Sequence, residues 1–155
     1  KALSLLATLF LCGRLLAQED GHPEHAHEHH RNELGVANAP VYFINEKVFA
    51  YGLHVHYVRS LKGTRFGIGL GYEKVFDGTT IGLIGSYQPF DRVHVNVSPG
   101  LSFEEREPDM LNFALHLEAS YEFEIGDLHI GPVIEYAYDT EDQHLSLGLH
   151  VGIGF

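Results

Sequence analysis

Residues 112–125, NFALHLEASYEFEI, alternate between apolar and polar or small side chains throughout. A repeat of two places successive side chains on opposite faces of an extended strand. The stretch therefore predicts a long β-strand with one apolar face and one face of small and titratable side chains. The apolar face consists of Phe113, Leu115, Leu117, Ala119, Tyr121, Phe123 and Ile125.

The same alternation recurs along the chain from Glu33 onward, interrupted by turn-forming residues at regular intervals. No helical periodicity is present in this part. The pattern predicts an all-β fold, an eight-stranded antiparallel up-and-down barrel. We expect strands near residues 34–44, 48–60, 65–76, 79–88, 93–104, 112–125, 128–138 and 144–155, with turns at 45–47, 61–64, 77–79, 89–92, 105–111, 126–127 and 139–143.

The composition of the two faces predicts that the barrel crosses a membrane. The polar face carries mostly Gly, Ser, Ala, His and Glu and almost no Lys or Arg, whereas soluble surfaces usually carry many charges of both signs. On the apolar face aromatic residues stand near the strand ends and aliphatic residues between them, as in Phe66, Ile68, Leu70 and Tyr72. Aromatic girdles around an aliphatic band are typical of transmembrane barrels.

The first eighteen residues, KALSLLATLFLCGRLLAQ, have the features of a secretory signal peptide. A positive Lys1 precedes an apolar run that is shorter than the roughly 20 residues of a membrane-spanning helix, and Ala17 offers a cleavage site. The alternative is a lipoprotein signal that acylates Cys12, but Leu11 is larger than that cleavage prefers. The expected organisation is a signal peptide at residues 1–18, a His-rich flexible segment at 19–32 and a barrel domain at 33–155.

Over residues 33–155 the chain resembles the small eight-stranded outer-membrane β-barrels of Gram-negative bacteria. The most specific feature is the last strand, which alternates and ends on the aromatic Phe155, and this ending resembles the signal that the outer-membrane insertion machinery reads. The resemblance implies a monomer in the outer membrane, in contact with its lipids, with the N-terminal segment in the periplasm. The apolar side chains of that strand are Leu147, Leu149, Val151 and Ile153.

Charge and cysteine content exclude several classes of protein. The formal net charge is −11, from 10 Lys and Arg against 21 Asp and Glu, so nucleic acid is not an expected partner. The single cysteine, Cys12, lies in the predicted signal peptide, so the barrel is not a disulfide scaffold. An eight-stranded barrel is just wide enough for its side chains to fill, so we do not expect an open channel.

The face expected to point inward is rich in histidine and glutamate and has no mid-strand Lys or Arg, so histidine is the available cation for the buried carboxylates. Three outcomes remain open: protonated histidines bonded to glutamates, protonated glutamates, or a divalent metal held by imidazoles and a carboxylate. The candidate metal ligands are two pairs spaced i, i+2, His54 with His56 and His116 with Glu118. The inward face comprises His54, His56, Glu73, His94, Glu104, His116, Glu118, Glu122, His129, Glu135, His144 and His150, with Ser86, Ser98, Ser102, Ser120 and Ser146.

Residues 21–30, GHPEHAHEHH, form a second candidate metal site. The segment is either a solvated linker or a collector of Zn²⁺, Cu²⁺ or Ni²⁺, the ions that imidazole suits. Only neutral imidazole ligates, so we expect release as the pH falls through about 6.5. The candidate ligands are His22, His25, His27, His29 and His30, with Glu24 and Glu28 beside them.

An enzymatic alternative rests on His144-Leu145-Ser146, which is similar to the His-x-Ser motif of the lipid A deacylases. In that family an acid follows the motif, but none follows Ser146 here; Glu135 on the neighbouring strand is the candidate to orient His144. Parity also turns His144 and Ser146 inward, away from a lipid substrate. We therefore predict a non-enzymatic outer-membrane barrel of structural or binding type, associated with divalent metals through its His-rich segment, with an outer-membrane lipid hydrolase as the alternative.

Overall fold

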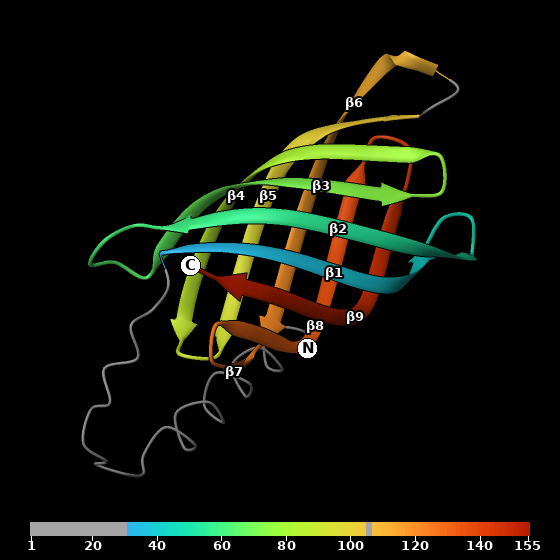
Figure 1. Cartoon of the computed structure of the whole chain (residues 1–155). Coiled ribbons are helices and arrows are strands. Elements are labelled where there is room, and N and C mark those ends of the chain that lie inside the picture. Colours follow the sequence, from blue (N-terminus) through green and yellow to red (C-terminus); the bar gives the residue numbers. More distant parts are fainter. Residues whose placement is uncertain (1–30, 105–106) are drawn as a thin grey trace, which may run out of the picture.

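The computed structural model describes residues 31–104 and 107–155, and it places nearly all of them in one antiparallel sheet (Figure 1). The predicted signal peptide and the His-rich stretch, residues 1–30, lie outside the described residues. Within the described ranges no helix is long and apolar enough to cross a membrane. The strands are β1 Asn32–Phe43, β2 Val48–Ser60, β3 Phe66–Val75, β4 Gly78–Phe90, β5 Val93–Glu104, β6 Glu107–Tyr121, β7 Phe123–Ile125, β8 Leu128–Asp139 and β9 Gln143–Gly154.

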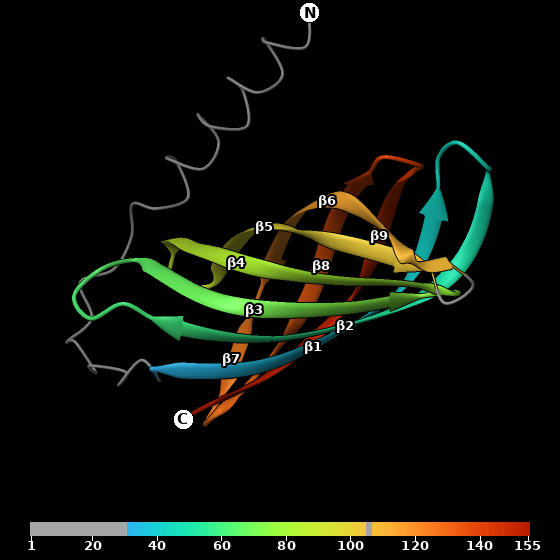
Figure 2. The ribbon, with the colours of Figure 1, turned by 90° about the horizontal axis from the view of Figure 1, so that it is seen from above.

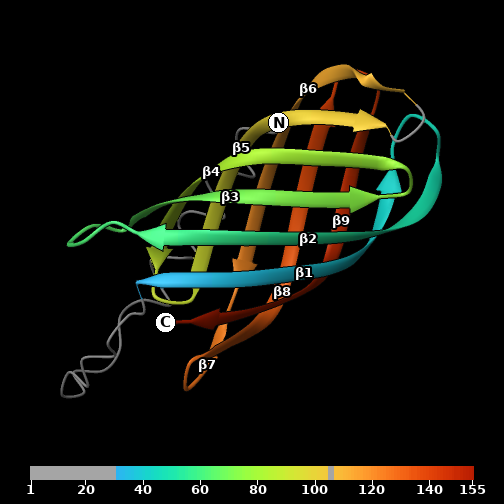
Figure 3. The ribbon, with the colours of Figure 1, turned by 45° about the horizontal axis from the view of Figure 1, so that its top comes forward.

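The sheet closes into a barrel. Each strand pairs with its neighbours in the order β6-β5-β4-β3-β2-β1-β9-β8-β7, and β6 also pairs with β8. The two segments β6 and β7 are one strand interrupted at Glu122, because both pair with β8 in succession. Figures 2 and 3 show the sheet curling round on itself. The predicted eight-stranded antiparallel up-and-down barrel is confirmed.

Two strands begin two or more residues earlier than the sequence predicted. β6 starts at Glu107 rather than 112, since Glu104 pairs with Glu107 after a register shift. Residues 107–111, which were predicted as part of a turn, belong to β6 instead, because a strand end that extends beyond the apolar surface does not require apolar side chains. β1 starts at Asn32, whose backbone N–H donates to the carbonyl of Phe155 over 3.0 Å and so joins the two ends of the described chain.

The outer surface has the predicted order of aromatic and aliphatic side chains. We call the end of the barrel that carries Asn32 and Phe155 the terminal end, and the opposite one the far end. The rings of Phe66 and Tyr87 stack 4.9 Å apart at the terminal end, and those of Tyr42 and Phe49 lie 4.9 Å apart at the far end. Between the two ends, Leu70 and Leu83 are paired across β3 and β4 and are 58% and 65% exposed. Soluble monomers rarely expose such continuous apolar surface, so this surface suits lipid.

The inside of the barrel is polar. Its buried apolar side chains are few and small, such as Val41 and Ala37, and no Lys or Arg of residues 31–104 and 107–155 is buried. The inward positions are filled mainly by histidine, glutamate and serine. The barrel therefore lacks a large apolar core, and its backbone hydrogen bonds and its lipid-facing apolar surface stabilise it instead. Its interior consists mainly of polar and titratable side chains. The buried serines are Ser86, Ser98, Ser102, Ser120 and Ser146.

Candidate functional site

The barrel interior holds a group of histidines and glutamates that extends along most of its length. We call this group the His/Glu column. The inward position predicted from parity is confirmed for all its members except Glu33, which was not among the predicted residues. Glu104, which was predicted to point inward, is exposed, because it is the last residue of β5 at the far end. The members are His54, His56, His94, His116, His129, His144 and His150, with Glu33, Glu73, Glu118, Glu122 and Glu135.

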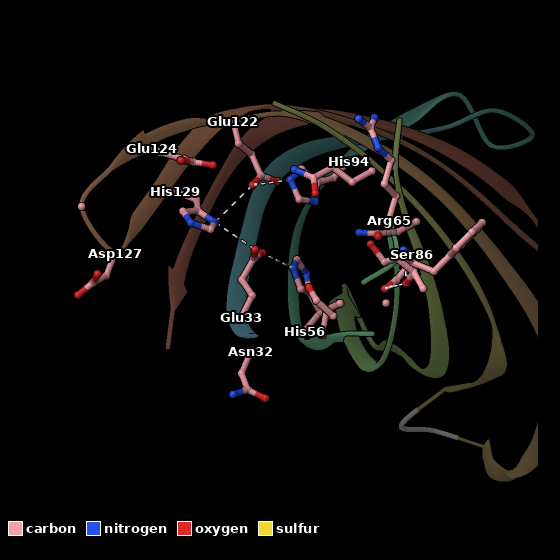
Figure 4. Close-up of a pocket in the computed structure, with 18 residues that line it drawn as sticks. Asn32, Glu33, His56, Arg65, Ser86, His94, Glu122, Glu124, Asp127 and His129 are labelled. Atoms are coloured by element: carbon pink, nitrogen blue, oxygen red, sulfur yellow. Dashed lines mark hydrogen bonds and ion pairs between the residues drawn. The ribbon is translucent and has the colours of Figure 1, made fainter. Parts of the chain in front are cut away.

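A cavity of about 320 Å³ at the terminal end leads into the column (Figure 4). His129 stands between two carboxylates on its wall: its Nδ1 lies 3.1 Å from Oε2 of Glu33 and 3.6 Å from Oε2 of Glu122. His94 faces the same Glu122 oxygen at 3.6 Å from its Nε2. The lining includes four carboxylates, Glu33, Glu122, Glu124 and Asp127, against one guanidinium, that of Arg65, so the cavity suits a cation.

Two imidazoles and one carboxylate converge at the floor of this cavity. The Nε2 atoms of His56 and His150 each lie 3.6 Å from Oε1 of Glu33. The two rings are stacked, with centroids 5.1 Å apart and planes 5° from parallel. We call Glu33, His56 and His150 the floor site.

Gly35 makes the floor site sterically possible. It lies on β1 beside His56 of β2, and the Nε2 atoms of His56 and His150 occupy the space that a Cβ would need. A Cβ at this position would lie 2.5 Å from Nε2 of His150 and closer still to Nε2 of His56. Real Cβ atoms essentially never come within 3.0 Å of another heavy atom, so only glycine leaves room for the two imidazoles as they stand.

The floor site has unsatisfied polar atoms. His150 is 1% exposed, yet neither of its ring nitrogens has a hydrogen-bond partner among the described residues. Nδ1 of His56 also lacks one, and Nδ1 of His150 has only an ion-pair contact, at 3.3 Å from Oε1 of Glu122. Buried polar atoms in native proteins are normally hydrogen-bonded, so this site is suited to an additional partner.

The middle of the column brings together part of the predicted metal site. His54 and His56 do converge, with ring centroids 5.4 Å apart, and Glu118 joins them from β6 with its Oε2 3.3 Å from Nδ1 of His54. The donor atoms of these three residues lie within 4.8 Å of one another. Asn96 donates to the other oxygen of Glu118 over 2.8 Å, which fixes the carboxylate.

His116 does not join Glu118, so the second predicted pair is wrong. Both side chains point inward from β6, but Nδ1 of His116 is hydrogen-bonded to Oε1 of Glu135 over 2.6 Å and lies 3.5 Å from Oε2 of Glu73. The reason is that His116 contacts Glu135 on the paired strand β8 and Glu73 on β3, whereas Glu118 contacts His54 on β2 and Asn96 on β5. We call Glu73, His116 and Glu135 the upper group; it corresponds to the hydrogen-bonded His–Glu arrangement that the sequence left open.

Sequence reasoning missed Glu33, which contacts His56, His129 and His150. The signal was present: Glu33 and Gly35 continue the inward parity of β1, but the first strand was expected to begin at 34. Because the predicted strand began at residue 34, Glu33 was not counted among the inward-facing residues of this strand.

The residues of the deacylase-like motif lie inside the barrel. His144 and Ser146 are both buried, as parity predicted, and so face away from the apolar outer surface. The carboxylate nearest to His144 is Glu73, whose Oε1 lies 3.5 Å from its Nε2, whereas Glu135 bonds His116. The expectation that Glu135 orients His144 is therefore wrong.

No family model and no curated protein matches this sequence. Solved structures do match. Neisserial surface protein A is 10% identical with a TM-score of 0.55, and the match covers 80% of this chain and 96% of that chain. The chain has the fold of the small outer-membrane β-barrels. Ail, the attachment invasion locus protein of Yersinia pestis, matches at 14% identity and a TM-score of 0.51, over 80% of this chain and 96% of that one. A de novo designed transmembrane β-barrel matches at 14% identity and a TM-score of 0.54, over 78% and 95%.

Proposed function

We propose that this chain is a non-enzymatic outer-membrane protein that binds one divalent transition-metal ion at the floor site. The observation that carries the proposal is the convergence of the Nε2 atoms of His56 and His150 and of the Glu33 carboxylate over Gly35. Two imidazole nitrogens and one carboxylate oxygen form a ligand set that zinc accepts. Imidazole also suits Cu²⁺ and Ni²⁺.

The distances at the floor site support a metal. Ligand atoms bound to one tetrahedral zinc at about 2.0–2.1 Å lie roughly 3.3–3.4 Å from one another. The nitrogen–oxygen distances of 3.6 Å at the floor site are within a few tenths of an ångström of that value. They are too long for hydrogen bonds, so a bound cation would satisfy the three groups better than they satisfy one another.

The contrast with the upper group supports the same choice. His116 and Glu135 already form a short hydrogen bond, so a network of protein groups accounts for their burial. His150 is equally buried but has no hydrogen-bond partner within residues 31–104 and 107–155. A bound cation would satisfy the ring nitrogens of His150, whereas His116 already has a hydrogen-bond partner.

The His-rich segment is placed by the sequence to supply this site. His30 precedes Glu33 by three residues, and three extended residues span at most about 10 Å. An ion bound at His30 is therefore held close to the terminal-end cavity, and the other candidate ligands precede it along the chain: His22, His25, His27 and His29. In this proposal the terminal end faces the periplasm, the barrel is a monomer inserted by the outer-membrane machinery, and lipids surround its apolar belt.

Calorimetry tests the proposal with three proteins: the chain from residue 19, the chain from residue 31, and the chain from residue 31 with His56→Ala and His150→Ala. We expect the first to bind the most zinc, the second to retain one ion, and the third to lose it. His144→Ala, which removes an imidazole at the far end, is the matched control and should keep the ion. A folded chain from residue 31 that binds no zinc would overturn the proposal.

A further inference from the structure

Among the residues that the structure describes, the floor site is one of four three-residue groups whose donor atoms lie within 4.8 Å of one another. The groups are linked in sequence. The first two share Glu33, and the second and third share His56. The third and fourth are joined by His54, whose Nδ1 lies 3.8 Å from Oε2 of Glu135. From the terminal end the groups are Glu33–Glu122–His129, Glu33–His56–His150, His54–His56–Glu118 and Glu73–His116–Glu135.

Both ends of this series reach a cavity. Glu33, Glu122 and His129 of the first group line the terminal-end cavity. Glu73 of the last group lines a second cavity, of about 200 Å³, at the far end, together with His144, whose Nε2 lies 3.5 Å from Oε1 of Glu73. The rim of the far-end cavity is rich in acids: Glu46, Asp77, Glu104, Asp139, Glu141 and Asp142. The column thus connects two cavities, one at each end of the barrel.

We infer that the His/Glu column passes divalent transition-metal ions between the two cavities by stepwise ligand exchange. This rests on the proposed function, because the floor site is the second step of the series. A shared residue holds the ion while the next group replaces the ligands left behind, so no open water-filled pore is required. This agrees with a barrel too narrow for a channel.

The charge of the column suits this passage. Every group contains at least one carboxylate, and the first and last contain two, so a dication has a counter-charge at each step. No Lys or Arg of the described residues is buried in the interior to repel it. Ions pass through a series of sites when binding at each is strong enough for entry and weak enough for exit. Groups of three ligands that share residues meet that condition better than one closed four-ligand site.

Unsatisfied atoms occur along the column and not only at the floor site. In the described part of the chain, Nδ1 of His54, Oε2 of Glu118 and Nε2 of His144 are buried without a hydrogen-bond partner. Their contacts are ion-pair distances, 3.3 Å between Nδ1 of His54 and Oε2 of Glu118 and 3.5 Å between Nε2 of His144 and Oε1 of Glu73. In a column that served only for packing, these buried atoms would be expected to form hydrogen bonds. The middle of the column and the level of His144 therefore have donor atoms that a visiting cation could engage, as the floor site does.

Reconstituted vesicles test the inference. The chain from residue 19 is inserted into lipid vesicles that contain a zinc-responsive dye, and zinc is added outside. We expect dye response at least tenfold faster than in protein-free vesicles. A second trapped dye of similar size, insensitive to zinc, should stay inside, and its escape would mean a leak and overturn the inference.

Variants of the upper group separate transfer from binding. Glu73→Gln and Glu135→Gln each keep the side-chain shape and lie outside the floor site, so we expect zinc binding by calorimetry to persist and transfer to slow tenfold or more. Asp91→Asn, in the exposed turn between β4 and β5, is the matched control and should transfer zinc normally.

The outcomes distinguish the two proposals. Zinc bound by the wild type without transfer would overturn the column as a path and leave the floor site standing. Transfer that both Gln variants perform as fast as the wild type would place the path elsewhere and overturn the inference. Absence of both binding and transfer in a folded barrel would overturn the proposed function as well.

Discussion

Replacing Gly35 by alanine should abolish metal binding without removing any ligand. The new Cβ would lie 2.5 Å from Nε2 of His150 and still closer to Nε2 of His56. Ordinary van der Waals contact begins near 3.4 Å, so each imidazole must retreat by about 0.9 Å or more. Metal–ligand distances tolerate changes of only about 0.2 Å. We therefore expect the zinc affinity of the chain from residue 31 to fall by a factor of about 100 or more.

The same substitution should leave the barrel folded. Overpacking an interior site typically costs about 1–3 kcal/mol, and here the groups that must move are side chains rather than backbone. Gly85→Ala on β4 is the matched control, because a Cβ there meets only the carbonyl oxygen of Val97, at 3.8 Å. Folding is checked by the difference in gel mobility between heated and unheated samples.

Calorimetric titration with zinc then compares Gly35→Ala, Gly85→Ala and the unchanged barrel. The account predicts that only the first loses the ion. If folded Gly35→Ala binds zinc as tightly as the unchanged barrel, the two Nε2 atoms over Gly35 do not hold the metal, and the reasoning from the floor site is refuted.

Three further predictions concern the His-rich segment, the last strand and the apolar outer surface of the barrel. Zinc binding by a peptide of residues 19–31 should weaken steeply between about pH 7 and pH 5, because protons compete for unperturbed imidazoles with a pKa near 6.5; a flat calorimetric profile would contradict this. Deleting Phe155 should impair insertion into outer membranes without blocking secretion, as cell fractionation would show; normal insertion would contradict the role of the last strand. The mature protein should fractionate with outer membranes because of its apolar belt, and recovery as a soluble periplasmic monomer would refute this.

The fold could be predicted from the sequence because one physical constraint repeats along the chain. Every strand must present apolar side chains to lipid and small or polar side chains to the interior. The alternation of apolar and polar residues in stretches such as 112–125 follows from this requirement. Strand ends that project beyond the apolar belt are free of that constraint. This is why the start of β6 at Glu107 was missed.

The site was less predictable. The alternation shows whether a side chain points inward or outward, but it does not show its height, which is its position along the barrel axis. Height depends on the register between strands, which pairs His56 with Gly35 and places His150 beside them. Register also separates His116 from Glu118, although they are two residues apart on one strand. Neither fact is visible in a single strand, so spacing alone grouped the wrong partners for His116.

Anomalous diffraction at the zinc edge tests the central claim most directly. Crystals of the mature protein, from residue 19 and grown with zinc, should show a strong peak inside the barrel, about 2.0–2.1 Å from Nε2 of His56 and of His150 and about 2.0–2.2 Å from an oxygen of Glu33. An intact barrel with zinc only at other positions, and with His150 unliganded, would contradict the claim that this interior site binds metal.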